Sequence, residues 1–250
     1  MAMFTPGNHH IPQNNQLTEQ VSLGFVAENA VLLTWPEVID PNQHQQIIQV
    51  EQAIKQHFTC ALLETIVSYN SLILYYQFQK VTQVQLIEQL TELLNSTQPS
   101  TLTSTSKVVE IPVYYGEDAG WDLTAIAAEK KLTTDEVIHL HSARRYRAYA
   151  LGFTPGFCYL ASLAPPLVMP RKARPRIKVP AGAVAIAEQQ TAVYPSASPG
   201  GWHILGQTPQ AMFSITNGNF TPMISVGDTV VFKPIDKTTF EQLGGNVDHE

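Results

Sequence analysis

Cysteine is scarce in this sequence of 250 residues, which contains only Cys60 and Cys158. Two cysteines cannot form the disulfide framework of a small secreted protein. No cation precedes Lys55, so the basic start of a signal peptide is missing. No apolar run approaches the roughly 18 residues that a membrane span requires. Together these absences predict a cytoplasmic protein without a membrane segment.

Charge is also limited, because only 14% of the residues are Asp, Glu, Lys or Arg. The formal net charge of −6 argues against a general nucleic-acid-binding protein, which needs a broad basic face. The hydrophobic content of 44% is typical of a folded chain, with ample core for one large domain or two smaller ones.

Several motifs of known chemistry are missing. The sequence has no GxxxxGK(S/T) phosphate loop, so ATP would need a different or shared site. No Met is followed by Lys, so the chain has no biotin-attachment motif. His139 and His141 lie on different faces of a helix, and no Cys or carboxylate cluster completes a metal site. The sequence therefore predicts no metal site in this chain, and leaves open whether the reaction uses a metal.

Residues 19–95 predict a small α/β domain. Two hairpins, SLGFVAE–AVLLTW and LLETIVSY–SLILYYQF, are each followed by a helical pattern. The first helix is expected to begin at Asp40 and Pro41. The second has an apolar stripe of Val84, Ile87, Leu90, Leu93 and Leu94. This order predicts an antiparallel sheet covered on one face by two helices, preceded by a disordered tail over residues 1–18.

Residues 96–106 predict a linker, because eight of the twelve residues from Asn95 to Ser106 are Ser or Thr. Beyond it, a capping box of Thr133 and Glu136 predicts a short helix. Many short strands separated by Pro and Gly then predict a closed or nearly closed β-barrel domain over residues 107–238. Residues 239–250 are expected to form a C-terminal tail.

All six arginines lie between Arg144 and Arg176, and five cations occupy the eight positions from Arg171 to Lys178. Planar guanidinium groups suit the recognition of carboxylates and phosphates. The run indicates either an anion-binding site or a solvated edge strand that is protected by charge.

The spacing of these cations predicts which of them share one face of a strand. Arg174, Arg176 and Lys178 are two residues apart, so on a strand they are expected to share one face, with Ile177 and Val179 on the other. Two turn-forming blocks, GFTPGF and SPGGW, flank the run. Such turns present aromatic rings and backbone N–H groups that can cradle oxyanions.

The blocks GFTPGFCYL, PRKARPRIKVPAGAVAIA, TAVYPSASPGGWHILGQTP and VGDTVVFKP resemble a known family. It contains the PxpB subunit of 5-oxoprolinase, allophanate hydrolase subunit 1, the KipI inhibitor of a sporulation histidine kinase, and the matching part of urea carboxylase. The resemblance is dense from about Val109 to Pro234 and looser over the N-terminal region. It implies an α+β N-terminal domain followed by a mainly-β, cyclophilin-like barrel.

The resemblance further implies a subunit of an ATP-dependent 5-oxoprolinase, a cyclic amide hydrolase that converts 5-oxo-L-proline to L-glutamate. It implies a heteromeric complex with a PxpC-type subunit and a PxpA-type protein, ATP at a shared site, and activity only in the complex. Two alternatives stay open. One is a carboxyltransferase-like subunit acting on urea-type amides, and the other is a histidine-kinase inhibitor.

For this chemistry, the catalytic candidates are Arg174, Arg176, His141 and Tyr146. The arginines would stabilise developing negative charge, and His141 and Tyr146 would transfer or position protons. The candidates for substrate or phosphate binding are Arg171, Gly156, Phe157, Tyr194, Gly200, Gly201 and Trp202. Cys158 is expected to be a packed side chain and not a nucleophile. Family members commonly have glycine where this chain has Glu188, which leaves the amide substrate open.

Overall fold

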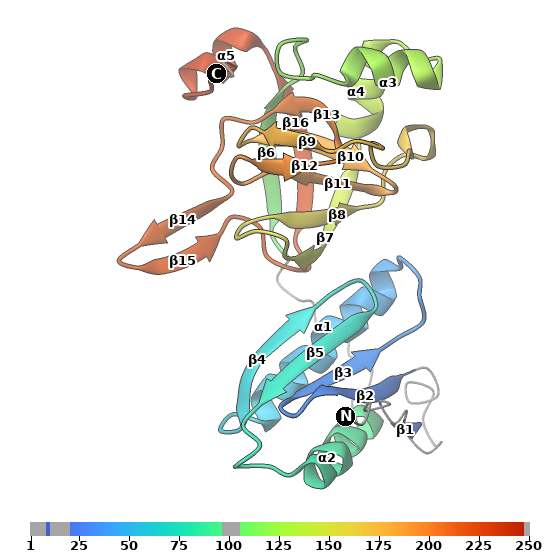
Figure 1. Cartoon of the computed structure of the whole chain (residues 1–250), viewed down its shortest axis with the longest axis vertical. Coiled ribbons are helices and arrows are strands. Elements are labelled where there is room, and N and C mark those ends of the chain that lie inside the picture. The colour runs from blue at the N-terminus through green and yellow to red at the C-terminus, as the bar shows by residue number, and fades with distance from the viewer. Residues whose placement is uncertain (1–8, 11–20, 97–105, 248–250) are drawn as a thin grey trace. The chain divides into compact units, whose positions relative to one another are not determined.

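The structure, a computed structural model, describes residues 9–10, 21–96 and 106–247 (Figure 1). The chain divides into two compact units, residues 1–104 and 105–250. The predicted tail over residues 1–18 lies outside the described residues, except for His9–His10, which form a short strand. The predicted linker over residues 96–106 also lies outside them, except at its two ends.

The N-terminal unit contains a five-stranded sheet in the order β1-β2-β3-β5-β4, with every neighbouring pair antiparallel. Its strands are β1 His9–His10, β2 Ser22–Ala27, β3 Ala30–Thr34, β4 Leu62–Val67 and β5 Ser71–Tyr76. Helix α1, Pro41–His57, contacts β4 and β5. As predicted, Asp40 caps this helix, and its side chain accepts a hydrogen bond of 2.7 Å from the Gln43 N–H. The covering of one sheet face by both helices stays a prediction.

Helix α2, Gln83–Ser96, buries three of the five residues of the predicted stripe, Leu90, Leu93 and Leu94, together with Leu86. Val84 is 64% exposed, so its predicted place on the buried face is wrong. The spacing explains the correction, because positions 86, 90, 93 and 94 follow the i, i+4, i+7, i+8 pattern of one helix face.

The C-terminal unit is built on a closed barrel in the order β10-β11-β8-β7-β16-β6-β13, which β10 closes by pairing with β13. The barrel strands are β6 Val108–Tyr114, β7 Arg145–Leu151, β8 Cys158–Ala161, β10 Ala183–Ala187, β11 Gln190–Val193, β13 His203–Gln207 and β16 Thr229–Ile235. Strands β6 and β16 are parallel, and the other pairs are antiparallel. The closed barrel confirms the predicted barrel architecture, and its closer likeness to cyclophilin stays a prediction.

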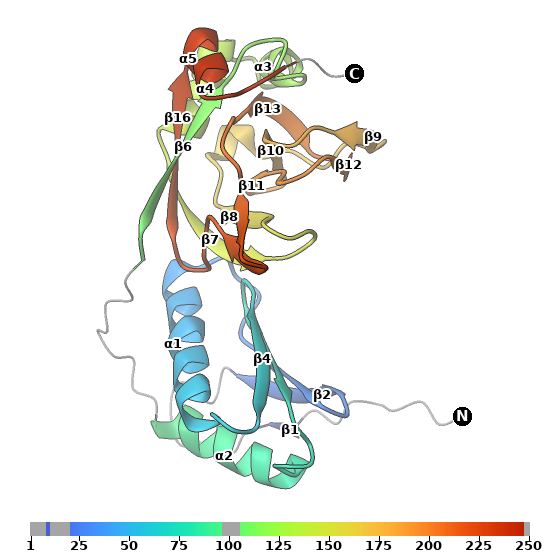
Figure 2. The same cartoon turned by 90° about the vertical axis from the view of Figure 1, so that its left-hand side faces the viewer.

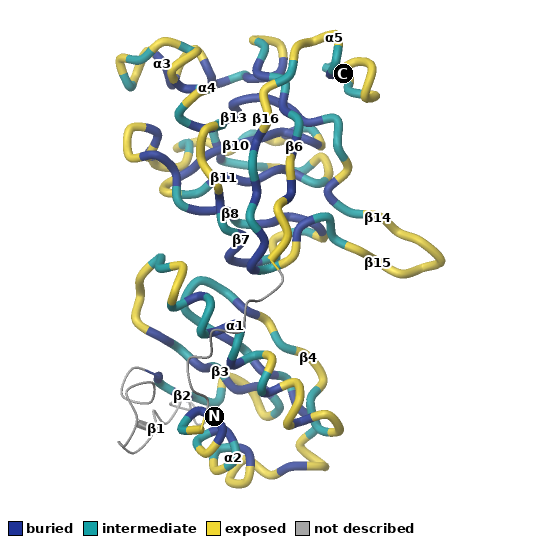
Figure 3. The backbone as a smooth tube through the Cα atoms, turned by 180° about the vertical axis from the view of Figure 1, so that it is seen from behind, coloured by how far each residue is buried: buried dark blue, intermediate teal, exposed yellow. Residues whose placement is uncertain are grey.

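Two small ribbons accompany the barrel. Strand β9, Arg176–Val179, pairs with β12, Ser198–Gly200, and this ribbon stands out from the barrel strands (Figure 2). Strands β14, Phe213–Thr216, and β15, Asn219–Pro222, form a hairpin that is mostly exposed, whereas the barrel strands are largely buried (Figure 3).

Four helical segments complete the unit: α3 Leu123–Lys130, α4 Thr134–Ser142, the 3-10 turn η1 Pro165–Leu167 and α5 Lys237–Gln242. The predicted capping box at the start of α4 is present. The predicted domain end at residue 238 is wrong, because it falls inside α5. Phe240 of this helix is buried, and its ring lies 5.4 Å from that of Tyr114 on β6. None of the helices in the described residues is long and apolar enough to cross a membrane.

A polar network lies inside the barrel core around His141. This residue is fully buried, with Nδ1 2.8 Å from Tyr115 Oη and Nε2 2.9 Å from Thr191 Oγ1. The Thr191 hydroxyl donates its one hydrogen to Ala185 O, so it accepts from the imidazole Nε2–H. Tyr115 therefore donates to Nδ1. Burial lowers the pKa of His141 from 6.5 to about 3, so the ring is neutral.

This buried imidazole makes the stability of the barrel depend on pH. Below pH 6.5 the unfolded chain binds a proton at His141 that the folded chain does not bind. We therefore expect the free energy of unfolding to fall as the pH decreases below 6.5, by up to about 1.4 kcal/mol per pH unit from this residue alone. His141→Gln is expected to remove that part of the slope, as measured by urea unfolding at several pH values.

The exposed His139, two residues earlier on the same helix, provides the matched control. His139→Gln is expected to leave the slope unchanged. An equal slope in the wild type and in His141→Gln would contradict the burial of a neutral imidazole.

Candidate functional site

A cavity of about 170 Å³ lies beside the β9–β12 ribbon. Its walls come from the loop between β7 and β8, the segment before β9, and the segment from Tyr194 to Trp202. The lining residues are Phe153, Phe157, Tyr159, Arg171, Lys172, Pro175, Tyr194, Pro199, Gly200, Gly201 and Trp202. The cavity thus brings together six predicted binding residues from three separate segments. Gly156 is the one predicted binding residue that does not line it.

One wall of the cavity is aromatic. The ring of Phe157 lies 4.9 Å from that of Tyr159, 5.6 Å from that of Tyr194 and 5.8 Å from that of Trp202, each in an edge-to-face arrangement. Phe153 adds a fourth such contact with Phe157, at 5.3 Å. Edge-to-face arrangements are favourable for aromatic pairs. The wall is therefore an apolar surface of packed rings.

The three predicted glycines have different roles. A Cβ on Gly200 would clash with the ring and the hydroxyl of Tyr194, so this position needs glycine for close packing. A Cβ on Gly201 would meet nothing nearer than 3.6 Å. Gly156 has a φ of 86°, which favours glycine, and it shapes the turn that presents Phe157.

A buried carboxylate, Asp122, organises the basic side of the site. It is 5% exposed and accepts hydrogen bonds from Lys172 Nζ at 2.7 Å and from the Ile204 N–H at 2.8 Å. Arg176 donates to both of its oxygens, at 2.9 Å from Nη1 and 2.8 Å from Nη2. The guanidinium of Arg176 also lies 5.3 Å from the centre of the Trp121 ring.

These contacts set the charge of Asp122. Burial by itself raises the pKa of this carboxyl, but the hydrogen bonds from Arg176, Lys172 and Ile204 outweigh it. The pKa falls from 3.8 to about 2, so the group is ionised at neutral pH. Arg176 is therefore occupied by a buried ion pair and positions the segment that carries the cavity-lining cations.

Sequence reasoning missed the role of Asp122. Its place before α3 predicts only a helix start, yet its side chain makes no capping hydrogen bond. Its partners lie 50, 54 and 82 positions further along the chain. No local pattern links residues so far apart, so the sequence held no signal for this contact.

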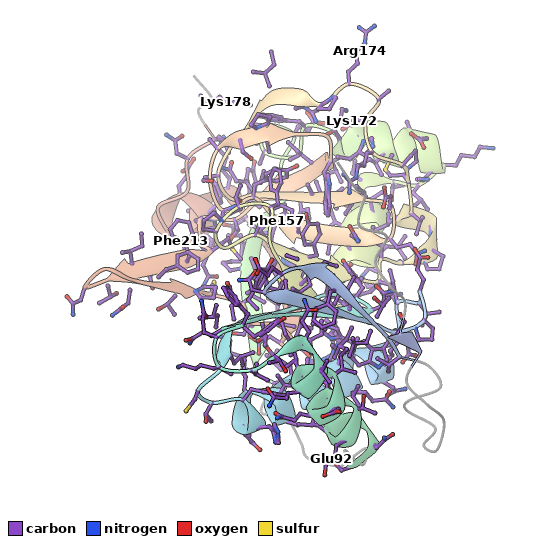
Figure 4. All side chains as sticks on the ribbon, turned by 60° about the horizontal axis from the view of Figure 1, so that its bottom comes forward. Glu92, Phe157, Lys172, Arg174, Lys178 and Phe213 are labelled. Carbon is purple, nitrogen blue, oxygen red and sulfur yellow. The ribbon has the colours of Figure 1, made fainter. Side chains whose placement is uncertain are left out.

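The three arginines predicted to act together are separated by the structure. Arg171 lines the cavity, and its Nε lies 3.5 Å from Glu188 Oε1. Arg176 is bound to Asp122. Arg174 is exposed, does not line the cavity, and points away from the loop before β9 (Figure 4). The catalytic assignment of Arg174 thus has no support from the geometry.

Exposure differs along β9. Ile177 is 92% exposed, whereas Val179 is buried and belongs to the hydrophobic core. The pairing with β12 shifts register between Ser198 and Gly200, and the predicted sharing of one face by the cations stays a prediction.

His141 and Tyr146 lie in the barrel core and do not line the cavity. Both are fully buried, and the Tyr146 hydroxyl donates to His141 O at 2.8 Å. A substrate group cannot reach either side chain, so the predicted role of both in proton transfer is corrected to a structural one. Cys158 is also buried, and burial raises the pKa of its thiol, in agreement with a packed side chain.

The lining residues define what the cavity can do. Arg171 and Lys172 supply positive charge, while burial raises the pKa of Tyr159 and of Tyr194, so both phenols keep their protons. None of the lining residues is a carboxylate, histidine or cysteine. In the part of the chain that the structure describes, no three His, Cys, Asp or Glu side chains form a metal-binding group. The site can therefore bind an anion and stabilise charge, but it lacks a general base of its own.

Asp122 is expected to control the stability of this site. In Asp122→Asn the cations of Arg176 and Lys172 lose their counter-charge, so we expect the free energy of unfolding to fall by about 3 kcal/mol at pH 7. The depressed pKa gives the sign of the pH dependence. The contribution of Asp122 is fully present above its unfolded pKa of 3.8 and is lost as the pH falls towards 2. Urea unfolding of both proteins measures the difference.

Asp118 offers a control four residues away. Its carboxylate accepts a 2.7 Å hydrogen bond from Lys237 at an exposed position. Asp118→Asn is expected to change the stability by less than about 1 kcal/mol. Equal decreases in the free energy of unfolding of the two variants would show that the Asp122 network stabilises the protein no more than an exposed ion pair does.

Comparison with known proteins gives the family of the chain. A family model for the carboxyltransferase domain, subdomain C and D, matches residues 21–223. The B-type subunit of 5-oxoprolinase from Haemophilus influenzae is 34% identical over 207 residues, which are 83% of this chain and 94% of that protein. The B-type subunit of 5-oxoprolinase from Bacillus subtilis is 29% identical over 238 residues, which are 90% of this chain and 97% of that protein.

Solved structures agree with this relationship. The crystal structure of TTHA0988 matches with a TM-score of 0.71 and 35% identity, covering 83% of this chain but only 40% of that one. The Kluyveromyces lactis urea amidolyase matches with a TM-score of 0.73 and 17% identity, covering 92% of this chain and 16% of that one, and shows the fold alone. The chain thus belongs to the carboxyltransferase domain, subdomain C and D family, which includes the B-type subunits of 5-oxoprolinase.

Proposed function

We propose that this chain is a subunit of an ATP-dependent 5-oxoprolinase and that its cavity holds 5-oxo-L-proline. The observation that carries the proposal is the cavity itself, which places Arg171 and Lys172 beside an aromatic wall. A substrate with one carboxylate and a small, flat, largely apolar ring matches these two surfaces. The relatives named as 5-oxoprolinase subunits, which match over nearly their whole length, support the same activity.

The size of the cavity favours a small substrate over a nucleotide. Its volume of about 170 Å³ is below the roughly 300–1,000 Å³ of sites for drug-sized ligands. The lining residues also include no phosphate loop. The cavity therefore does not fit ATP, and we place ATP at a site shared with a partner.

The residues of this chain act through binding and charge. A lactam amide is stable, so its carbonyl needs activation by ATP before water can open the ring. Arg171 holds the substrate carboxylate, and Lys172 adds positive charge while it stays bound to Asp122. Phe157, Tyr194 and Trp202 orient the ring and exclude water from its faces. Arg176 acts indirectly, because its ion pair with Asp122 fixes the segment that carries Arg171 and Lys172.

The missing general base supports a heteromeric enzyme. Because no lining residue is a carboxylate, histidine or cysteine, we propose that a partner supplies the group that accepts a proton from water. We assign this role to a PxpC-type subunit and a PxpA-type protein in the cytoplasm, and we expect no turnover from the isolated chain.

The two alternatives fit the site less well. Urea itself has no carboxylate for Arg171 to hold, and a carboxyltransferase reaction would need a biotin carrier on another chain. A protein that only inhibits a histidine kinase would not require a small cavity with two cations and an aromatic wall.

The proposal is tested by ATP-dependent glutamate formation from 5-oxo-L-proline, with the chain and its two partners combined and each omitted in turn. Activity is expected to need all three proteins. Arg171→Gln removes a charge-assisted contact with the carboxylate, so we expect kcat/KM to fall roughly 10- to 100-fold, mainly through KM.

Arg145 on β7 is exposed and does not line the cavity. Arg145→Gln is therefore the control and is expected to keep wild-type activity. Full activity without this chain, or an Arg171→Gln enzyme with unchanged KM, would refute the proposal.

A further inference from the structure

The cations that line or border the cavity have partners of very different strength. Lys172 and Arg176 are bound to the buried Asp122 at 2.7 to 2.9 Å. The Nε of Arg171 lies 3.5 Å from Glu188 Oε1, and both side chains are 57% exposed. An exposed ion pair at this distance is weak and open to exchange, whereas a buried network with short hydrogen bonds is not. Arg171 is therefore the lining cation that can change partner.

Backbone strain coincides with this pair. Four described residues other than glycine have a positive φ: Lys131, Phe153, Glu188 and Asn217. Lys131 ends helix α3, and Asn217 lies in the Asn-Gly turn of the β14–β15 hairpin, so both positions are ordinary for this conformation. Phe153 lines the cavity, and Glu188 sits in the turn between β10 and β11, next to Arg171.

A φ of 54° at Glu188 favours glycine or asparagine over a long carboxylate side chain. Nothing in the turn requires the carboxylate, since the Glu188 N–H contact with Met169 O involves only the backbone. The one charged partner of its side chain in the described residues is Arg171. The geometry thus points to Arg171 as the reason for a glutamate at this position.

We propose that Glu188 competes with an anionic ligand for Arg171 and thereby limits how tightly the cavity binds anions. In the free protein its carboxylate neutralises the guanidinium from outside the cavity. An anionic ligand displaces it and forms charge-assisted hydrogen bonds with the guanidinium from within the cavity. A neutral lactam or amide cannot replace the carboxylate and gains nothing from Arg171. This inference rests on the proposed cavity as the ligand site, and it deepens the proposal by naming the residue that limits the affinity for anions.

The competition is tested by isothermal titration calorimetry on the full chain. The probes are 5-oxo-L-proline, inorganic phosphate and the uncharged lactam 2-pyrrolidinone. Glu188→Gln keeps the length of the side chain and removes its charge. We expect this variant to bind both anions about two- to five-fold more tightly than the wild type, with no change for 2-pyrrolidinone.

Two further variants separate direct competition from a general change of charge. Glu129→Gln removes the same charge at an exposed position beside Lys130 and is expected to leave anion binding unchanged. In the Arg171→Gln background, Glu188→Gln is expected to give no gain, because the cation for which it competes is absent.

The outcomes are distinguishable. If Glu188→Gln binds phosphate more tightly than the wild type while 5-oxo-L-proline does not bind, the competition is supported and the proposed substrate is wrong. A gain that persists in the Arg171→Gln background, or that Glu129→Gln reproduces, overturns the competition. An unchanged affinity in Glu188→Gln, or no anion binding by any variant, overturns it as well.

Discussion

The ion pair of Asp122 with Arg176 and Lys172 joins three segments of the C-terminal unit that are far apart in the sequence. The carboxylate precedes α3, the two cations come from the segment leading into β9, and the fourth hydrogen bond comes from Ile204 on β13. A buried carboxylate with this many donors fixes its partners in one arrangement, because losing any donor leaves charge without compensation. The segment with Arg171 is thus attached to the barrel, and the aromatic wall faces a basic side of defined shape.

In this arrangement, cations that look equivalent in the sequence have different roles. Arg176 is a positioning residue, since its guanidinium is occupied by Asp122 and stacked near Trp121. Arg171 reaches the cavity with only a weak, exposed counter-charge. The contrast follows from burial, because a carboxylate at 5% exposure holds its partners far more firmly than one at the surface. Binding is therefore assigned to the cation with the weaker partner.

Much of the fold was predictable because local chemistry specifies it. The cap at Asp40, the capping box at the start of α4 and the closed barrel all follow from patterns within short windows. The turn blocks GFTPGF and SPGGW also marked the residues that meet at the cavity, because glycine and aromatic residues cluster where backbone and rings pack closely. The errors at the candidate site came from long-range contacts. A histidine in the core network, a carboxylate paired 54 positions away and an arginine pointing to solvent have no local signature.

The proposed function requires that this cavity binds an anionic ring through Arg171. The chain contains three tryptophans, whose indole N–H signals can be followed in NMR spectra of the full chain as 5-oxo-L-proline is added. We predict a saturable shift of the Trp202 signal, no shift of the Trp35 signal, and loss of the response in Arg171→Gln. An unchanged Trp202 signal at saturating ligand, or the same shift in the Arg171→Gln variant, would contradict the account.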